Sequence, residues 1–382
     1  MKCSGIDANR GAAVEITGSG VLQSVEEFVR TPEGLNYVAP GFIDIQVNGF
    51  AGVDYCSPNA SMEEIGRSLD LIFSTGTTRI FPTVITGGRE EMLGAIRNLA
   101  KAKRTLKYGR ALEGFHIEGP HISPHDGARG AHPLRQVRPP DTEEFDRWQD
   151  AAEGNVRLVT VSPEWPEAPR YIEHVAGTGV VVSIGHLDAN AEQIDAAVRA
   201  GATLSTHLGN GAHGMLPRHP NYLWHQMADD RLAASFIVDG IHLDQSFLTV
   251  ALRSKGLERA VLITDAVMPA MCAPGPYMLG EVEVQLHPEG KVTLREDTNR
   301  LAGSALRMDQ GVGNLMRMCG LTLSEALTLA TRNPARVGRV PLRQRGLQPG
   351  ERADVVEFSY DKQARSIQVL RTWIDGELVY QS

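Results

Sequence analysis

Four polar residues each close an apolar stretch of this chain in a way that suits metal chemistry. Glu118 ends the stretch 114–118 and is followed at once by Gly119-Pro120. His186, His207 and Asp265 end three later apolar stretches. One carboxylate and two neutral imidazoles are ligands that suit Zn²⁺ with a position left open for water, and Fe²⁺ or another divalent ion also fits them. The pattern therefore predicts a divalent metal site.

The stretches that carry these residues have the character of buried parallel strands. Apolar runs alternate along the chain with helix-like segments, which is typical of a parallel sheet covered on both faces. Eight such strands are expected at 41–48, 77–84, 111–119, 156–163, 179–186, 202–208, 233–242 and 259–266. Eight units predict a (β/α)8 TIM-like barrel, whose active site lies at the carboxyl ends of the strands. The alternative is an open doubly wound sheet, but no glycine-rich phosphate loop follows the first strand.

Helices are expected between these strands, for example at 61–74, 89–104, 190–200 and 244–255. Asn190 and Asp244 stand where N-caps would begin the last two. Because side chains alternate along a strand, His116 should point to the same face as Glu118 and lie in the pocket near the metal.

The two ends of the chain differ from the middle. Residues 1–38 and 345–382 are strand-rich, and neither is large enough to bury a core alone, so we expect them to pair into one small, discontinuous β-sandwich domain. The barrel would span 39–344, with a β-hairpin insertion near 277–297 and helices from about 307 to 337. Asp375-Gly376 is a hairpin signal in the last segment.

Composition excludes several classes of protein. The chain has 382 residues, 42% of them hydrophobic, and a formal net charge of −8, so a basic nucleic-acid-binding face is not expected. No apolar run approaches the roughly 20 residues of a membrane span, and no apolar signal core follows Met1. Four scattered cysteines show no CxxC spacing and are expected to be reduced. We expect a cytoplasmic protein.

The ordered motifs resemble those of the N-acetylglucosamine-6-phosphate deacetylases of the amidohydrolase superfamily. The resemblance runs from about 38 to 338 through the motifs at 40–44, 116–120, 185–186, 206–210, 239–242, 264–266 and 301–305. It implies a metal-dependent barrel flanked by a small β-domain, and hydrolysis of N-acetylglucosamine-6-phosphate to glucosamine-6-phosphate and acetate. It also implies a homodimer or a higher homo-oligomer.

The resemblance assigns roles to individual residues. Glu118, His186 and His207 would hold the catalytic metal ion, and Asp265 would be the general base and acid. His132 would contact the substrate beside Ala131 and help to stabilise the developing oxyanion. The residues that would contact the sugar and its phosphate are Asn210, Gly211, Arg218, Asp239, His242, Leu301, Ala302 and Gly303. In similar enzymes the loop that carries Arg218 can reach into a neighbouring subunit.

Two departures from the resemblance matter. Many amidohydrolases carry His-x-His at the end of the first strand, whereas this chain has Gln46-Val47-Asn48. Amides are poorer Zn²⁺ ligands than imidazoles, so we expect one tightly held ion; alternatively, Gln46 and Asn48 only satisfy polar groups in the pocket. The loop at 211–221 also differs from that of the best-known members and leaves the exact substrate open.

Other functions stay open on the sequence alone. The substrate could be N-acetylgalactosamine-6-phosphate, or another N-acyl or cyclic amide handled by the same superfamily. A catalytically inactive scaffold barrel is a third alternative. The complete set of Glu118, His186, His207 and Asp265 argues against an inactive barrel.

Overall fold

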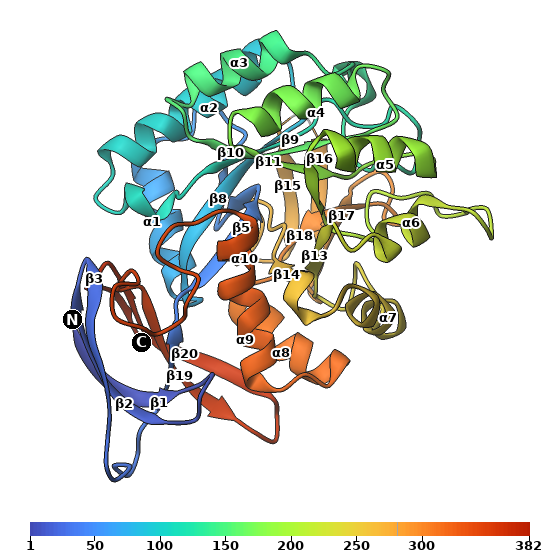
Figure 1. Ribbon diagram of the computed structural model, residues 1–382. Helices are drawn as coiled ribbons and strands as arrows, with labels where there is room; N and C mark the ends of the chain where they lie inside the picture. The colour runs from blue at the N-terminus through green and yellow to red at the C-terminus, as the bar shows by residue number, and fades with distance from the viewer. Residues whose placement is uncertain (281) are drawn as a thin grey trace.

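The computed structural model describes residues 1–280 and 282–382 and contains the predicted barrel of eight parallel strands (Figure 1). The strands are hydrogen-bonded in the order β14-β13-β12-β11-β10-β9-β8-β5. Their bounds are β5 Phe42–Val47, β8 Thr77–Ile85, β9 Phe115–Glu118, β10 Val156–Val161, β11 Val181–Ile184, β12 Ala202–Ser205, β13 Ala233–Ile237 and β14 Ala260–Ile263. Nearly every residue of these strands is buried, because helices cover the outside and side chains fill the inside.

The barrel closes where its first and last strands meet. Val47 and Ala266 form a parallel bridge. The Asp265 amide donates to the Gln46 carbonyl at 3.0 Å, and the Asn48 amide donates to the Ala266 carbonyl at 2.8 Å. The end of β14 is thereby held beside the end of β5, which brings Asp265 next to Gln46 and Asn48.

Helices alternate with the strands and cover the barrel, as Figure 1 shows. They are α1 Met62–Phe73, α2 Arg89–Thr105, α3 Thr142–Ala151, α4 Ala168–Gly177, α5 Ala191–Ala200, α6 Tyr222–Ala228, α7 Gln245–Lys255, α8 Met308–Cys319, α9 Leu323–Ala330 and α10 Arg332–Val337. Both predicted N-caps are confirmed, since Asn190 accepts a hydrogen bond from the Gln193 amide and Asp244 accepts one from the Phe247 amide. In the described part of the chain, no helix is both long and apolar enough to span a membrane.

The two ends of the chain form a separate β-rich unit, and the N- and C-termini lie in the same sheet (Figure 1). Its seven strands have the order β21-β20-β19-β4-β1-β2-β3. Their bounds are β1 Lys2–Asp7, β2 Ala13–Ser19, β3 Val21–Glu27, β4 Tyr37–Pro40, β19 Val355–Asp361, β20 Ser366–Ile374 and β21 Glu377–Gln381. The predicted sandwich is built from one continuous sheet. Val21 of β3 forms an antiparallel bridge with Arg352, and a small hydrophobic core lies within this unit.

Buried ion pairs fasten this sheet to the barrel. Arg79 of β8 donates to both carboxylate oxygens of Asp354, at 2.7 and 3.0 Å, and Arg343 pairs with the same carboxylate. Although burial opposes it, the two guanidinium groups lower the pKa of Asp354 to about 2. The end of the barrel opposite the predicted site is therefore closed by a charged but compensated cluster.

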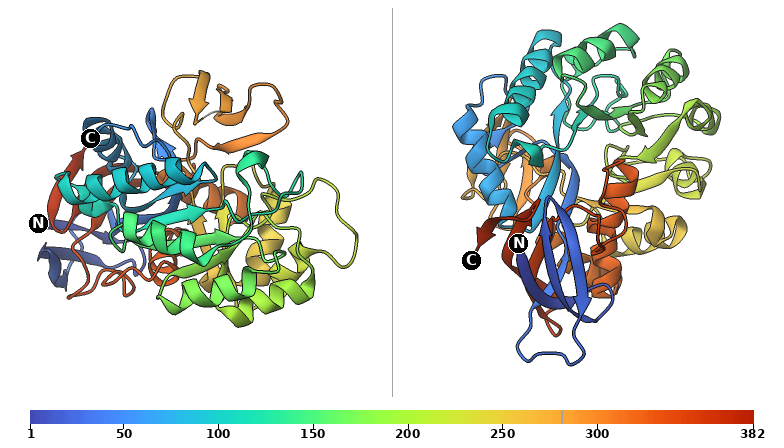
Figure 2. Two further views of the ribbon diagram at one scale, coloured as in Figure 1. Left: turned by 90° about the horizontal axis from the view of Figure 1, so that it is seen from above. Right: turned by 60° about the vertical axis from the view of Figure 1, so that its left-hand side comes forward.

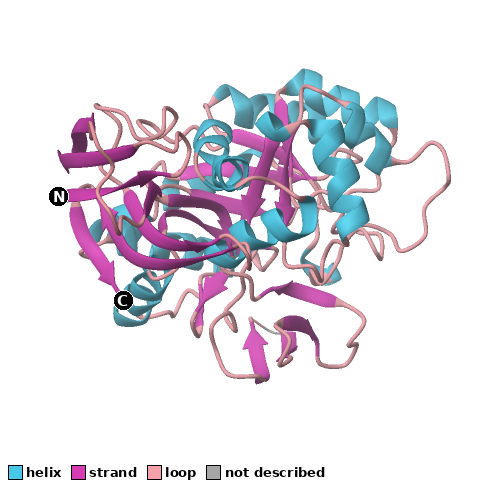
Figure 3. Ribbon diagram, turned by 90° about the horizontal axis from the view of Figure 1, so that it is seen from below, coloured by secondary structure: helices cyan, strands magenta, loops and turns pink. Residues whose placement is uncertain are grey.

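The predicted hairpin at 277–297 is only part of a larger element. Four antiparallel strands form a third sheet: β15 Gly275–Leu279, β16 Val282–Leu286, β17 Lys291–Leu294 and β18 Leu301–Ser304. The turn expected at 288–290 joins β16 to β17, and residue 281 lies outside the described residues. Two further views show that this sheet stands off from the barrel on one side (Figures 2 and 3). The sequence predicts only part of this sheet, because the motif that forms β18 indicates a substrate-binding segment and carries no separate strand signal.

Candidate active site

A cavity of about 1000 Å³ opens at the carboxyl ends of the barrel strands, between them and the β15–β18 sheet. Its walls include most of the residues that the sequence singled out. Those that line it are Asn48, Glu118, Ala131, His132, His186, His207, Asn210, Gly211, His242, Asp265, Leu301, Ala302 and Gly303. Residues from the ends of six barrel strands and from β18 therefore meet in one place, as expected of a barrel enzyme.

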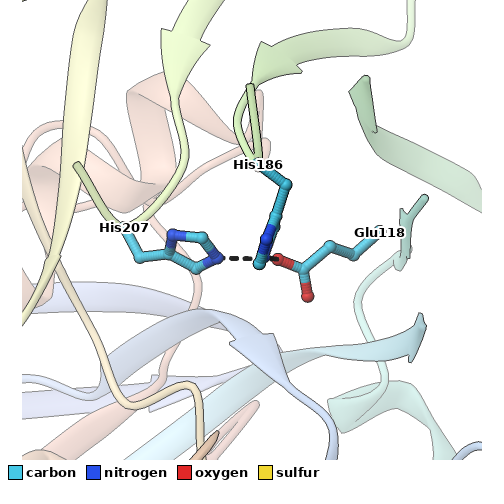
Figure 4. Close-up of side chains that lie close together, drawn as sticks. All are labelled: Glu118, His186 and His207. Carbon is cyan, nitrogen blue, oxygen red and sulfur yellow. Dashed lines mark hydrogen bonds and ion pairs between the residues drawn. The ribbon is translucent and has the colours of Figure 1, made fainter. Parts of the chain in front are cut away.

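Glu118, His186 and His207 converge at the bottom of this cavity (Figure 4). Their ligand atoms all lie within 4.8 Å of one another, and all three residues are buried. Glu118 Oε1 is 2.8 Å from His207 Nε2 and 3.3 Å from His186 Nε2. Although burial alone would raise the pKa of Glu118, the two neighbouring imidazoles hold it well below its usual range. The cluster therefore carries an ionised carboxylate.

The protonation of His186 fits a cation at this cluster. Its Nδ1 lies 2.9 Å from the Ala128 carbonyl, which can only accept, so Nδ1 carries the proton. In the neutral ring, Nε2 then presents a lone pair toward the Glu118 carboxylate. Two acceptors facing each other are unfavourable unless a positive charge lies between them. This donor set fits a divalent ion held by all three residues, with the Ala128 carbonyl fixing one imidazole from behind.

Three site residues have a backbone conformation that side chains rarely adopt. The φ angles are 48° at His186, 28° at His207 and 50° at Asp265. Each residue lies two positions after the last residue of its strand, where the chain must turn out of the barrel. Left-handed backbone in non-glycine residues costs on the order of 1 kcal/mol or more each and is characteristic of functional sites. Here it turns the metal-facing side chains toward a common centre.

Two glycines allow the chain to pass closely over the His186 ring. A Cβ on Gly211 would lie 2.5 Å from His186 Nδ1, and one on Gly130 would lie 3.0 Å from its Cε1. Both residues also have positive φ. Glycine is therefore required at both positions, which explains why Gly211 belongs to the motif and why Gly130 precedes Ala131.

Asp265 is held by the two amides that replace imidazoles. Gln46 Nε2 donates to Asp265 Oδ1 at 3.2 Å, and Asn48 Nδ2 donates to the same oxygen at 2.7 Å. Gln46 Oε1 in turn accepts from the Thr206 hydroxyl at 2.7 Å, so Gln46 lies one layer below the cavity and does not line it. Burial, with the negative charge of Glu118, raises the pKa of Asp265 to about 6. The other carboxylate oxygen remains available to the cavity.

His132 lies beside the metal cluster, with its ring centroid 4.5 Å from that of His186. Its Nδ1 is 2.8 Å from the Thr86 hydroxyl, which leaves Nε2 as the nitrogen available to a bound molecule. Burial and the neighbouring His186 lower the pKa of His132 to about 3, so the ring is neutral. A hydroxyl proton donated to Nδ1 would place the ring's own N–H in the cavity, where it can serve as a hydrogen-bond donor.

A second group of residues lines the cavity on the side of β12 and β13. Asn210 and Gly211 follow β12, and His242 follows β13. Asp239 does not line the cavity; it accepts from His242 Nδ1 at 2.6 Å and from the His242 amide at 2.8 Å. The carboxylate thus orients the imidazole and leaves its Nε2 for a ligand.

Besides Gln46 and Asp239, two further predicted site residues do not line the cavity. His116 does face the barrel interior, but its Nε2 is 2.8 Å from the Thr160 hydroxyl and it does not line the cavity. It lies one layer deeper than Glu118, because residues two apart on a strand share a face but not a depth. Arg218 is exposed on the loop between β12 and α6, which projects from the body of the molecule (Figures 1 and 2), and it does not line its own cavity.

Two residues that support the site were not predicted from the sequence. Thr86 at the end of β8 contacts His132, and Thr206 before His207 contacts Gln46. Thr206 belongs to the conspicuous Thr-His-Leu-Gly-Asn segment and could have been suspected. Thr86 carries no comparable signal, because its partner lies 46 residues away in the sequence.

Comparison with known proteins agrees with this geometry. Residues 37–379 match the sequence profile of the Amidohydrolase family, which is most of the chain. The chain therefore belongs to the amidohydrolase family, whose members are hydrolases that rely on divalent metal.

Within that family, the chain is similar to amino-sugar-phosphate deacetylases. N-acetylglucosamine-6-phosphate deacetylase of Bos taurus is 35% identical over 364 residues, covering 90% of this chain and 83% of that protein. N-acetylgalactosamine-6-phosphate deacetylase of Shewanella sp. (strain ANA-3) is 35% identical over 343 residues, with the same two coverages. A structure of N-acetyl-D-glucosamine-6-phosphate deacetylase from Mycobacterium smegmatis superposes with a TM-score of 0.88 at 30% identity, covering 99% of this chain and 98% of that one. These relatives confirm the resemblance inferred from the motifs.

We predict about one divalent ion per chain when the protein is prepared without added metal. The amide N–H groups of Gln46 and Asn48 point at Asp265, which disfavours a second cation there. Elemental analysis of Glu118→Gln should show loss of the ion, because a neutral amide replaces the anionic ligand. Asn48→Ala, which changes a neighbouring residue outside the ligand cluster, should keep it. Two tightly held ions in the unaltered protein, or full retention in Glu118→Gln, would contradict this assignment.

Proposed function

We propose that this protein hydrolyses the acetamide of N-acetylglucosamine-6-phosphate to glucosamine-6-phosphate and acetate. The observation that carries the proposal is the position of Asp265, whose carboxylate faces the Glu118, His186 and His207 cluster within one cavity. The galacto epimer is the second candidate, because a deacetylase for that sugar phosphate is as similar to this chain as one for the gluco form.

The residues divide the reaction between them. Glu118, His186 and His207 would hold a divalent cation, Zn²⁺ in this proposal, which would polarise the acetyl carbonyl and lower the pKa of an attacking water. Asp265 accepts a proton from that water as its oxygen bonds to the carbonyl carbon. Asp265 then delivers the proton to the amine nitrogen as the C–N bond breaks. A pKa raised toward neutrality suits a carboxylate that must both take and release a proton.

His132 stabilises the negative charge that develops on the carbonyl oxygen. A neutral imidazole donates one N–H without having to lose its own proton, and the Thr86 contact holds the ring in place. Removing one such donor from an oxyanion site typically lowers kcat by about 10²-fold or more. Leu301, Ala302 and Gly303 line the sugar from the opposite wall through the β18 segment.

The phosphate is bound by the backbone of Asn210 and Gly211 and by His242, with Arg218 supplied by a neighbouring subunit. Arg218 does not line its own cavity, and the loop that carries it also presents apolar surface. Met215 is 92% exposed, and Trp224 at the start of α6 is 47% exposed. Exposed apolar side chains on a projecting loop fit a contact with a second copy of the chain, so we propose a homodimer.

The state of the cysteines indicates the cellular setting. Cys3, Cys56, Cys272 and Cys319 are all free thiols. Free thiols without disulfides are usual in a reducing compartment. We propose that the protein acts in the cytoplasm.

Acetate release from four sugars tests this function directly. The panel is the gluco and galacto forms of the N-acetylated sugar, each with and without the 6-phosphate. The unaltered protein should act on at least one phosphorylated sugar with a higher kcat/KM than on its unphosphorylated form, because the phosphate contributes charge-assisted hydrogen bonds. A preference for unphosphorylated sugars would reject the sugar-phosphate assignment while leaving an amide hydrolase.

Asp265→Asn should lower kcat by at least about 10²-fold, because the amide keeps the shape of the carboxylate but cannot accept the proton of the water. Metal content should stay nearly unchanged, since Asp265 is not among the three clustered ligands. Glu91→Gln is a matched control, because Glu91 is another carboxylate of the same cavity wall. Near-normal turnover of Asp265→Asn would remove this residue from the mechanism.

Mixed dimers test where Arg218 acts. Arg218→Ala and Asp265→Asn should each be poorly active alone on the phosphorylated sugar. If Arg218 serves the neighbouring site, mixing equal amounts after subunit exchange should restore activity to roughly a quarter of the sites, since one site of each mixed dimer receives both residues. If Arg218 serves its own site or none, no site in the mixture gains both residues, and activity should stay at the level of the two variants measured separately.

A further inference from the structure

The cavity is an acidic environment for a molecule that carries a phosphate. Its lining includes the carboxylates Asp54, Glu91, Glu118, Asp265 and Asp297. The whole chain also carries a negative formal net charge, −8. A bound anion must therefore be held by a local positive charge and cannot rely on the field of the whole protein. Among the described residues that line the cavity, Arg300 is the only lysine or arginine.

Arg300 lies on the loop between β17 and β18, directly before the Leu301–Gly303 wall. Its Nη2 is 3.1 Å from Asp126 Oδ1 and 3.3 Å from Asp126 Oδ2, and its Nε is 3.9 Å from an oxygen of Asp297. None of the hydrogen bonds or ion pairs within the described residues uses Nη1. The side chain is 33% exposed, so this nitrogen can still meet a ligand.

Asp126 connects Arg300 to the catalytic loop. Arg129 Nη2 is 3.1 Å from the same carboxylate, and Arg129 Nη1 donates to the His132 carbonyl at 2.8 Å. Although Asp126 is 68% exposed, these contacts link the guanidinium of Arg300 to the loop that carries His132. A guanidinium held by a carboxylate on one side is pre-organised to bind an oxyanion on its other side.

Gly127, which follows Asp126, extends this connection to the segment after Gly211. A Cβ on Gly127 would lie 3.0 Å from His213 Cα, so the loop after β9 packs directly on the segment that follows Gly211. Through Asp126 and Gly127, Arg300 is therefore connected to the segment beside Asn210 and Gly211, where the phosphate is placed in the proposed function.

We propose that Arg300 binds the phosphate of the substrate from within the same subunit and is a specificity-determining residue of the site. This inference rests on the proposed function, because it requires a phosphorylated substrate. Asp126 positions the guanidinium, and the free donors of Nη1 meet the phosphate oxygens. Phosphate recognition would then combine a cation of the chain itself with Arg218 of the neighbouring subunit.

The test compares kcat/KM for a phosphorylated N-acetyl amino sugar and its unphosphorylated form in three variants. Arg300→Met should lower the value for the phosphorylated sugar by about 10- to 100-fold and leave the unphosphorylated sugar nearly unchanged. Arg300→Lys should recover part of the loss, because the ammonium keeps the charge but not the planar fork. Arg295→Met is the matched control, since Arg295 pairs with Glu283 at 3.1 Å on the same sheet and does not line the cavity.

A second measurement separates binding from turnover. Calorimetric titration with glucosamine-6-phosphate should show weaker binding to Arg300→Met than to the unaltered protein by a similar factor. Equal losses on both sugars would mean that Arg300 only fastens the β15–β18 sheet to the loop at 126, and no loss on either sugar would mean that it has no part in recognition. Either result overturns the inference while the unaltered protein still deacetylates the phosphorylated sugar. No acetate release by the unaltered protein from either phosphorylated epimer would instead reject the proposed function, and this inference with it.

Discussion

The buried carboxylate of Glu118 is the constraint around which this structure is organised. It lies between two imidazoles at the bottom of a barrel, with only 2% of its surface exposed. An isolated ionised carboxylate cannot be buried without a large loss of solvation free energy, so a compensating positive charge is required. The Ala128 carbonyl fixes the proton of His186 on the far nitrogen and leaves a lone pair toward Glu118. The protein thus supplies three converging ligands and leaves the charge to a cation.

The barrel fold brings these three residues together and holds them in place. Strand ends from distant parts of the chain meet at one face, and the closing seam between β5 and β14 delivers Asp265 to the same point. Left-handed backbone at His186, His207 and Asp265 is held in place by that packing. The third sheet, β15–β18, then covers the cavity from outside, and its β17–β18 loop contributes Arg300 to the lining. The barrel itself does not require this sheet.

The eight barrel strands and the strand-end residues Glu118, His186, His207 and Asp265 could be predicted from the sequence pattern, because strand-end residues of parallel strands must share one face. The other predicted residues that line the cavity followed from the resemblance to the deacetylases. The N-caps Asn190 and Asp244 were equally local signals. Depth within the barrel and the path of loops were not predictable in this way. His116 shares a face with Glu118 but contacts Thr160 one layer below, and Arg218 follows a loop that projects away from its own cavity. Contacts such as Thr86 with His132 or Arg300 with Asp126 join residues far apart in the sequence. No local sequence pattern predicts such contacts.

In the proposed mechanism, a catalytic cation is bound by Glu118, His186 and His207. Anomalous X-ray diffraction from crystals of the protein as purified, measured on both sides of the zinc absorption edge, tests this most directly. We expect one strong anomalous peak per chain, within about 2.0–2.2 Å of Glu118 Oε1, His186 Nε2 and His207 Nε2. A map without a peak at this cluster, in crystals of protein that deacetylates its substrate, would mean that these three residues do not hold the ion.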